Sequence, residues 1–101
     1  MAYQIKWTEI AVEDFENVIV YLLNNWSLNV ANDFSQILQK KLIILSHHPH
    51  IGIASINFLS VRSVSITKHN RLFYRITGYT IELLNLFDNR QNPEINAYKN
   101  S

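Results

Sequence analysis

The cationic side chains of this sequence gather in its second half. Arg62, Lys68, Arg71 and Arg75 fall within a stretch that contains no acid, and Arg90 follows further along the chain. Guanidinium groups match the geometry of a phosphate or a carboxylate and hold it with paired hydrogen bonds. We therefore expect four of these residues to bind an anionic or polar partner, namely Arg62, Arg71, Arg75 and Arg90.

The same side chains also have a plainer interpretation. Lys68, His69 and Asn70 are residue types of a polar hairpin turn, and Arg71 and Arg75 could simply be solvated on an exposed sheet face. The distribution of charge favours the functional interpretation, because residues 1–50 are acidic on balance and residues 51–101 are basic. Such asymmetry is a hint of an anionic partner.

Composition indicates a globular protein. The chain has 101 residues, of which 48% are hydrophobic and 17% charged, so a single domain over residues 1–101 is expected. The absence of cysteine fits a reducing compartment. Neither a signal peptide nor an apolar run long enough to span a membrane is recognisable, so we expect a cytoplasmic protein without membrane contact.

A short strand and a long helix are expected at the start of the chain. Tyr3, Ile5 and Trp7 alternate with polar residues, as in a strand with one buried face. From Thr8, a good helix cap, apolar residues follow helical spacing as far as Trp26. We place Trp26 at the corner of a helical hairpin and assign it to the core.

A second helix follows directly. It can begin at Ser27 or Asn29, and it should stop at His47-His48-Pro49 because proline disfavours helix in the residue before it. Few residues separate the two helices, so they must lie antiparallel. The apolar stripe that the second helix should bury comprises Ala31, Phe34, Leu38, Leu42 and Leu45.

The remainder of the chain predicts a sheet. A connection over residues 49–60 is unusually apolar and is expected to pack onto the body of the protein. Three strands follow, with turns at 67–70 and 77–78, and the last strand, over 80–87, is apolar on both faces, which suits a central position. The expected fold class is α+β in the order β-α-α-β-β-β, an antiparallel sheet with the helical hairpin packed on one face. The opposite face is then open to a partner.

Several short motifs occur in a characteristic order. They are Trp26 at the hairpin corner, Pro49 and Gly52 after the second helix, Arg62 at the start of a strand, the run from His69 to Arg75, and Leu84 to Phe87 leading into Asn89 to Pro93. As a set, over nearly the whole chain, they resemble the RelE/ParE superfamily of bacterial toxins from type II toxin–antitoxin modules.

The resemblance implies a small basic protein that arrests growth and is held inactive by a cognate antitoxin, in a toxin–antitoxin hetero-oligomer. ParE-like members poison DNA gyrase, whereas RelE-like members cleave mRNA on the ribosome. The long hairpin, the Trp26 corner and the run from His69 to Arg75 are more similar to ParE, so gyrase is the expected target. An mRNA endonuclease and an inactive relative that serves as an interaction module stay open as alternatives.

A RelE-like activity would imply a catalytic set on the sheet face. Cleavage of RNA at the 2′-hydroxyl needs a base, a cation that stabilises the phosphorane, and an acid for the leaving oxygen. Lys68 or His69 would serve as the base, and Arg71 and Arg90 would hold the phosphate. His69 or Tyr98 would serve as the acid.

His47, His48 and His50 raise the question of a zinc site. Zinc requires three or four converging ligands, and adjacent histidines around a proline rarely converge. Cationic groups at the end of a helix have an electrostatic reason to be there without a metal. We therefore expect neither a metal nor a cofactor.

Overall fold

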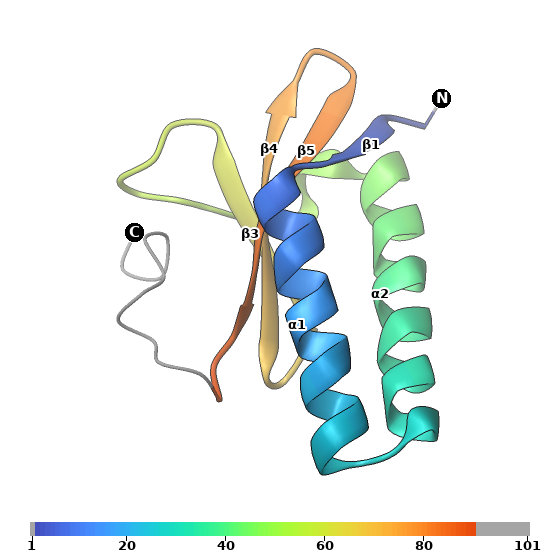
Figure 1. Cartoon of the computed structure of the whole chain (residues 1–101). Helices are drawn as coiled ribbons and strands as arrows, with labels where there is room; N and C mark the ends of the chain where they lie inside the picture. The colour runs from blue at the N-terminus through green and yellow to red at the C-terminus, as the bar shows by residue number, and fades with distance from the viewer. Residues whose placement is uncertain (1, 91–101) are drawn as a thin grey trace.

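The computed structural model describes residues 2–90. Strand β1 leads into two long helices, and a turn of 3-10 helix (η1) with the short strand β2 connects these to three further strands (Figure 1). The elements are β1 (Gln4–Trp7), α1 (Glu9–Asn25), α2 (Leu28–His47), η1 (Pro49–Ile51), β2 (Ile53–Ala54), β3 (Val61–Thr67), β4 (Asn70–Thr77) and β5 (Thr80–Asp88).

Both helices begin at side-chain caps. The hydroxyl of Thr8 accepts a hydrogen bond from the backbone N–H of Ala11, and the hydroxyl of Ser27 does the same for Val30. Of the two caps that the sequence offers for α2, Ser27 is the one used. The helix ends at His47, directly before the residue that precedes proline, so the predicted boundaries of the hairpin are confirmed.

The sheet is mixed, with the strand order β1-β5-β4-β3-β2. Strands β2 to β5 pair antiparallel, but β1 runs parallel to β5, with Ile5 opposite Ile81. The α+β class and the hairpin on one face are confirmed, while the antiparallel description holds for the meander alone. Alternation of side chains fixes which face of a strand is buried but is the same for both strand directions, so the parallel pairing of β1 left no mark in the sequence.

The main core lies between the hairpin and one face of the sheet. Figure 1 shows α1 and α2 side by side on this face. Phe34 of α2 stacks on Phe15 of α1 with ring centroids 6.2 Å apart, and Trp7 of β1 meets the edge of Phe15. The sheet supplies Val64, Ile66, Leu72, Tyr74, Ile81, Leu83 and Leu86 to this core.

A bulge in β5 gives the opposite face its own small apolar cluster. Phe73 pairs with Asn85 but Tyr74 pairs with Leu83, so Leu84 is the extra residue. Leu84 packs on the open face with Val61, Phe73 and Phe87. Asp14 of α1 supports the bulge, because its carboxylate accepts hydrogen bonds from the backbone N–H of Leu86 and the side chain of Asn85. Burial raises the pKa of Asp14 in this position.

Two expectations about apolar residues are wrong. Trp26 is 65% exposed, because it follows the last turn of α1 at a corner that projects past the strands (Figure 1). The connection after η1 does not pack down either, and Ile56 and Leu59 are 89% and 95% exposed. Local hydrogen bonds from Phe58 N to Ser55 Oγ and from Ser55 N to Val61 O close this loop on itself, beyond the edge of the sheet.

Candidate functional site

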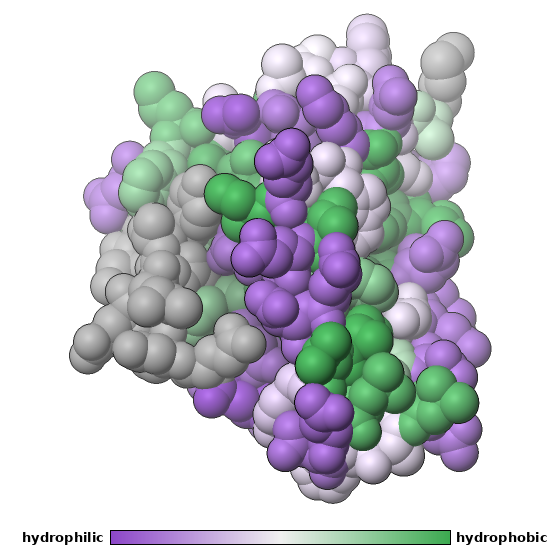
Figure 2. Space-filling model, in the orientation of Figure 1, coloured by the Kyte–Doolittle hydropathy of each residue, from purple (hydrophilic) through white to green (hydrophobic). Residues whose placement is uncertain are grey.

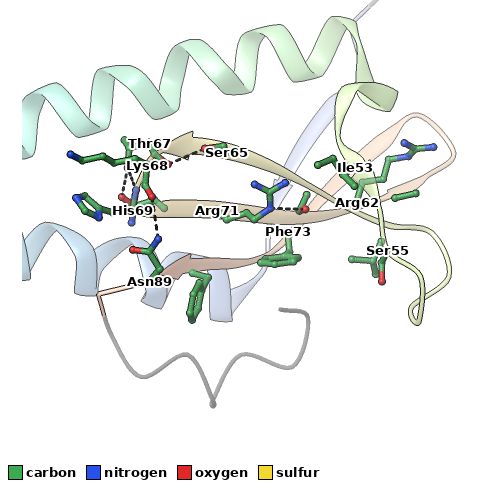
Figure 3. A pocket seen from close by; sticks show the side chains of 15 residues that line it. Ile53, Ser55, Arg62, Ser65, Thr67, Lys68, His69, Arg71, Phe73 and Asn89 are labelled. Carbon is green, nitrogen blue, oxygen red and sulfur yellow. Dashed lines mark hydrogen bonds between the residues drawn. The ribbon is translucent and has the colours of Figure 1, made fainter. Parts of the chain in front are cut away.

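The open face of the sheet contains a half-open cavity of about 300 Å³ over β3 and β4 (Figure 3). Four of the seven site residues predicted from the sequence line this cavity, together with hydroxyl, amide and aromatic groups. The wall is formed by Arg62, Lys68, His69 and Arg71 with Ile53, Ala54, Ser55, Val61, Ser63, Ser65, Thr67, Asn70, Phe73, Phe87 and Asn89.

Arg71 lies in the middle of the cavity and is held from one side. Its Nε donates a hydrogen bond of 2.9 Å to the hydroxyl of Ser63 on the neighbouring strand. The two terminal nitrogens of the guanidinium have no partner among the residues that the structure describes. They are therefore oriented donors that an incoming anion can use.

Arg62 lines the cavity, but its guanidinium also stabilises the fold. Its Nη1 donates to the carbonyl oxygens of Gly52 at 2.8 Å and His50 at 3.3 Å. These bonds tie β3 to η1 and turn the guanidinium toward η1, on the face of the sheet that Arg62 shares with Tyr74. One nitrogen of the group is thus committed to the fold, which makes Arg62 a weaker anion ligand than Arg71.

Lys68 and His69 form the turn between β3 and β4, at one end of the cavity (Figure 3). The turn is rigid, because Thr67 Oγ1 accepts from the N–H of His69 and donates to Asn70 Oδ1. Asn89 fixes it from the other side by donating its side-chain amide to the carbonyl of Lys68. The polar-turn interpretation is therefore correct for the backbone, while both side chains remain at the cavity.

Arg75 lies outside the cavity and is neutralised by a neighbouring acid. It forms an ion pair with Glu82 on β5, with 3.1 Å between Nη2 and Oε1. The hydrogen bond from Arg75 holds the pKa of Glu82 below its ordinary value. The predicted binding role of Arg75 thus competes with a partner that is already in place.

Arg90 is directed away from the cavity and toward helix α1. Its guanidinium binds the buried carboxylate of Asp88 through two hydrogen bonds of 2.7 and 2.9 Å and lies 4.7 Å from the ring centre of Tyr21. Burial alone would raise the pKa of Asp88, but the hydrogen bonds from Arg90 outweigh this effect and the pKa is lowered. The structure therefore does not bring Arg71 and Arg90 to one point. Tyr98 lies outside the described residues.

Sequence reasoning did not identify the polar groups that hold the cations. Ser63 positions Arg71, and Asn89 positions the turn at Lys68. The alternation of Ser63 and Ser65 with apolar residues placed both serines on the open face, which was the one available signal. Tyr21 carried no such signal, because its contact with Arg90 depends on how α1 sits on the sheet.

No group of three or more histidine, cysteine or acidic side chains converges on a possible metal position within residues 2–90. In the same range, no helix has both the length and the apolarity needed to cross a bilayer. The polar side chains of the cavity are cationic, hydroxyl, amide and imidazole groups, without an acid among them. This donor set suits an anion.

The fold and the site define a small α+β protein with a cationic open face. A comparison with known protein families identifies the family to which the chain belongs. A model of the ParE toxin of the type II toxin–antitoxin system parDE matches residues 5–93. The match covers most of the chain, so the chain belongs to the ParE toxin family and is the toxin of a type II module. No curated protein sequence gives a significant match.

Solved structures of other toxins have the same fold. The chromosomal ParDE toxin–antitoxin system of P. aeruginosa matches with a TM-score of 0.72 and 17% identity, covering 86% of this chain and 96% of that chain. The RelBE2 toxin–antitoxin complex of Mycobacterium tuberculosis matches with a TM-score of 0.61 and 17% identity, covering 87% and 99%. The YoeB dimer of Staphylococcus aureus gives 0.62 and 17%, covering 86% and 97%. ParE, RelE and YoeB toxins therefore share this architecture.

Proposed function

We propose that this toxin arrests growth by binding DNA gyrase, in the manner implied by its ParE family membership. The geometric observation that supports this target is the separation of two arginines. Arg71 faces the cavity on the open side of the sheet, whereas Arg90 is engaged by Asp88 and lies over Tyr21 of α1. A nuclease that relied on both guanidinium groups would need them at one phosphate, and this arrangement does not provide that.

The second candidate is a ribosome-dependent mRNA endonuclease, and one observation favours it. Lys68, His69 and Arg71 line a single cavity, so a base, an acid and a phosphate ligand are available within one site. In this case the activity would depend on Arg71 alone among the arginines, unless Arg90 leaves Asp88 when substrate binds.

Alanine substitutions in cells separate the two candidates. For a gyrase-directed toxin, Arg71→Ala removes one binding contact and should reduce toxicity only in part. Expression of such a toxin should stop replication first and induce a DNA-damage response. Loss of a charged donor at a transition state costs roughly 10²–10³ in rate, so in a nuclease the same change should abolish toxicity. Arg90→Ala should also reduce toxicity only in part. The folding of this variant must be checked, because the substitution leaves the buried carboxylate of Asp88 without its ion-pair partner. All-or-none loss together with cut mRNA on ribosomes would contradict the gyrase assignment.

The cognate antitoxin is proposed to dock along the edge strand β1 and helix α2. A groove of about 340 Å³ lies there, lined by Tyr3, Ile5, Trp7, Gln39, Leu42, Ile43 and Ser46. Within residues 2–90, β1 is an edge strand, with β5 as its one neighbouring strand. Figure 2 shows an apolar area on the lower part of the helical hairpin. Leu23, Trp26 and Leu28, around the corner between α1 and α2, are exposed. An extended segment followed by an amphipathic helix would fit the edge and these apolar side chains.

Ile43→Asp should therefore weaken binding of the antitoxin by roughly tenfold or more, because a charge would replace an apolar side chain that lines the groove. Ile43 is 56% exposed in the free toxin, so the fold should tolerate the change. Titration calorimetry with the protein encoded beside the toxin gives the affinity. Ile56→Asp, in the exposed loop after β2, is the matched control and should bind normally. Equal weakening by both variants would place the antitoxin elsewhere.

A further inference from the structure

The cavity on the open face concentrates cations that no acid neutralises. Arg62, Lys68 and Arg71 line it, and none of its lining residues is aspartate or glutamate. Within residues 2–90, the two ion pairs between side chains involve Arg75 and Arg90, which both lie outside the cavity. Arg75 and Arg90 are thus neutralised, and the guanidinium of Arg62 is held by the carbonyl oxygens of His50 and Gly52, so Arg71 and Lys68 are the cations that share the concave surface. Such a surface attracts anions over distances of about the Debye length.

The guanidinium of Arg71 is held in one orientation before any anion binds. The hydrogen bond from its Nε to Ser63 restricts the guanidinium, and Ser63 itself is only 8% exposed. A fork fixed in this way loses less conformational entropy when it binds a phosphate than a free side chain would. Figure 3 shows the bond beside Phe73, with the rest of the group facing the cavity.

The cations are arranged along a line. In Figure 3, Lys68 and His69 lie at one end of the site and Arg71 lies in the middle. Arg62 borders the opposite end beside Ile53, but its guanidinium is turned to the carbonyl oxygens of His50 and Gly52. A single small anion could contact only one part of this array. A polymer with a regular series of negative charges can contact all of it. The hydroxyls of Ser65 and Thr67 hold the neighbouring turn by donating to Thr67 O and Asn70 Oδ1, so the charged donors remain for a ligand.

We propose that this groove binds the sugar–phosphate backbone of the DNA that gyrase holds, so that the toxin contacts both the enzyme and its DNA. The proposal rests on the gyrase-directed function and adds the ligand of the cationic face. Because phosphate contacts carry no sequence information, the binding is independent of sequence and sensitive to salt.

Fluorescence anisotropy of a labelled DNA duplex, titrated with the antitoxin-free toxin at several salt concentrations, tests the proposal. Each phosphate contact contributes about 0.9 to the slope of log affinity against log salt, so Arg71→Gln should reduce the slope by about that amount. Between 50 and 200 mM salt this corresponds to roughly 3.5-fold less loss of affinity. Arg75→Gln is the matched control, with the same charge change on the same strand outside the cavity, and its slope should equal that of the wild type.

Equal slope changes in the two variants would mean that only net charge matters, and would overturn the site. Displacement of the duplex by inorganic phosphate at constant ionic strength would assign the groove to a free anion, which also contradicts the proposal. So would binding of single-stranded RNA through Arg71 with no binding of the DNA duplex.

A supercoiling assay on the wild type separates this inference from the function on which it rests. If supercoiling is inhibited while the two variants bind DNA alike, the DNA site is wrong and the gyrase target stands. If DNA binds through Arg71 while supercoiling is unaffected, the gyrase target is wrong and the phosphate site stands.

Discussion

Phe34→Ala is expected to lower the free energy of unfolding by about 3–5 kcal/mol. Phe34 is 5% exposed and stacks on Phe15, so its removal leaves a cavity between α2 and α1 that rigid neighbours cannot fill. A domain of this size is stabilised by only about 5–15 kcal/mol in total. The variant should therefore melt more than about 12 °C below the wild type.

Ile37→Ala on the same helix provides the matched control for this experiment. Ile37 is 43% exposed, so its truncation should cost about 1 kcal/mol at most. Circular dichroism during heating and during urea titration measures both variants. A shift of only a degree or two for Phe34→Ala would mean that the hairpin does not bury the stripe described here.

Gly52→Ala is expected to lower the free energy of unfolding by about 1–3 kcal/mol. The reason is a lack of space for the added methyl group, not backbone strain. The backbone of Gly52 is extended, with φ −71°, but an added Cβ would collide with the hydroxyl of Tyr74 and lie 2.9 Å from the carbonyl oxygen of Ser63. Tyr74 is fully buried, and its hydroxyl accepts from Gly52 N at 3.0 Å and donates to Pro49 O at 2.7 Å. Burial raises the pKa of Tyr74.

A double-mutant cycle identifies the cause of the Gly52 effect. In a Tyr74→Phe background the nearest obstructing atom is absent, so Gly52→Ala should cost less than in the wild type. Gly78→Ala is the comparison, because Gly78 has φ +60° and open space around it. Its cost, about 1–2 kcal/mol, is conformational and should not depend on Tyr74. Equal costs of Gly52→Ala in both backgrounds would show that the tyrosine hydroxyl is not the obstacle.

Local signals in the sequence were sufficient for most of the fold. Thr8 and Ser27 cap the helices, Pro49 ends α2, and the apolar middle of β5 places that strand between two others. Each of these effects acts over a few residues, or through the simple alternation of a strand. The mixed character of the sheet is different, because the direction of β1 relative to β5 depends on the path of the whole helical hairpin.

The candidate site was predictable in composition but not in arrangement. The sequence shows five cations near one another along the chain, yet it does not show which of them are neutralised. That depends on cross-strand register, which sets Arg75 opposite Glu82, and on the end of β5, where Arg90 turns back to Asp88. The bulge at Leu84 adds one residue to β5 between these two pairs. An alternation pattern alone would miss its effect on which side chains share a face.

Inhibition of gyrase by the purified toxin is the direct test of the proposed target. Relaxed plasmid is incubated with gyrase and toxin, with and without the antitoxin, beside a reconstituted translation reaction that contains the same toxin. We expect supercoiling to stop and broken DNA to accumulate, antitoxin to restore supercoiling, and mRNA on the ribosomes to stay intact. Cut mRNA in the translation reaction, with supercoiling unimpaired at the same toxin concentration, would contradict the proposed target and make the protein a ribosome-dependent RNase.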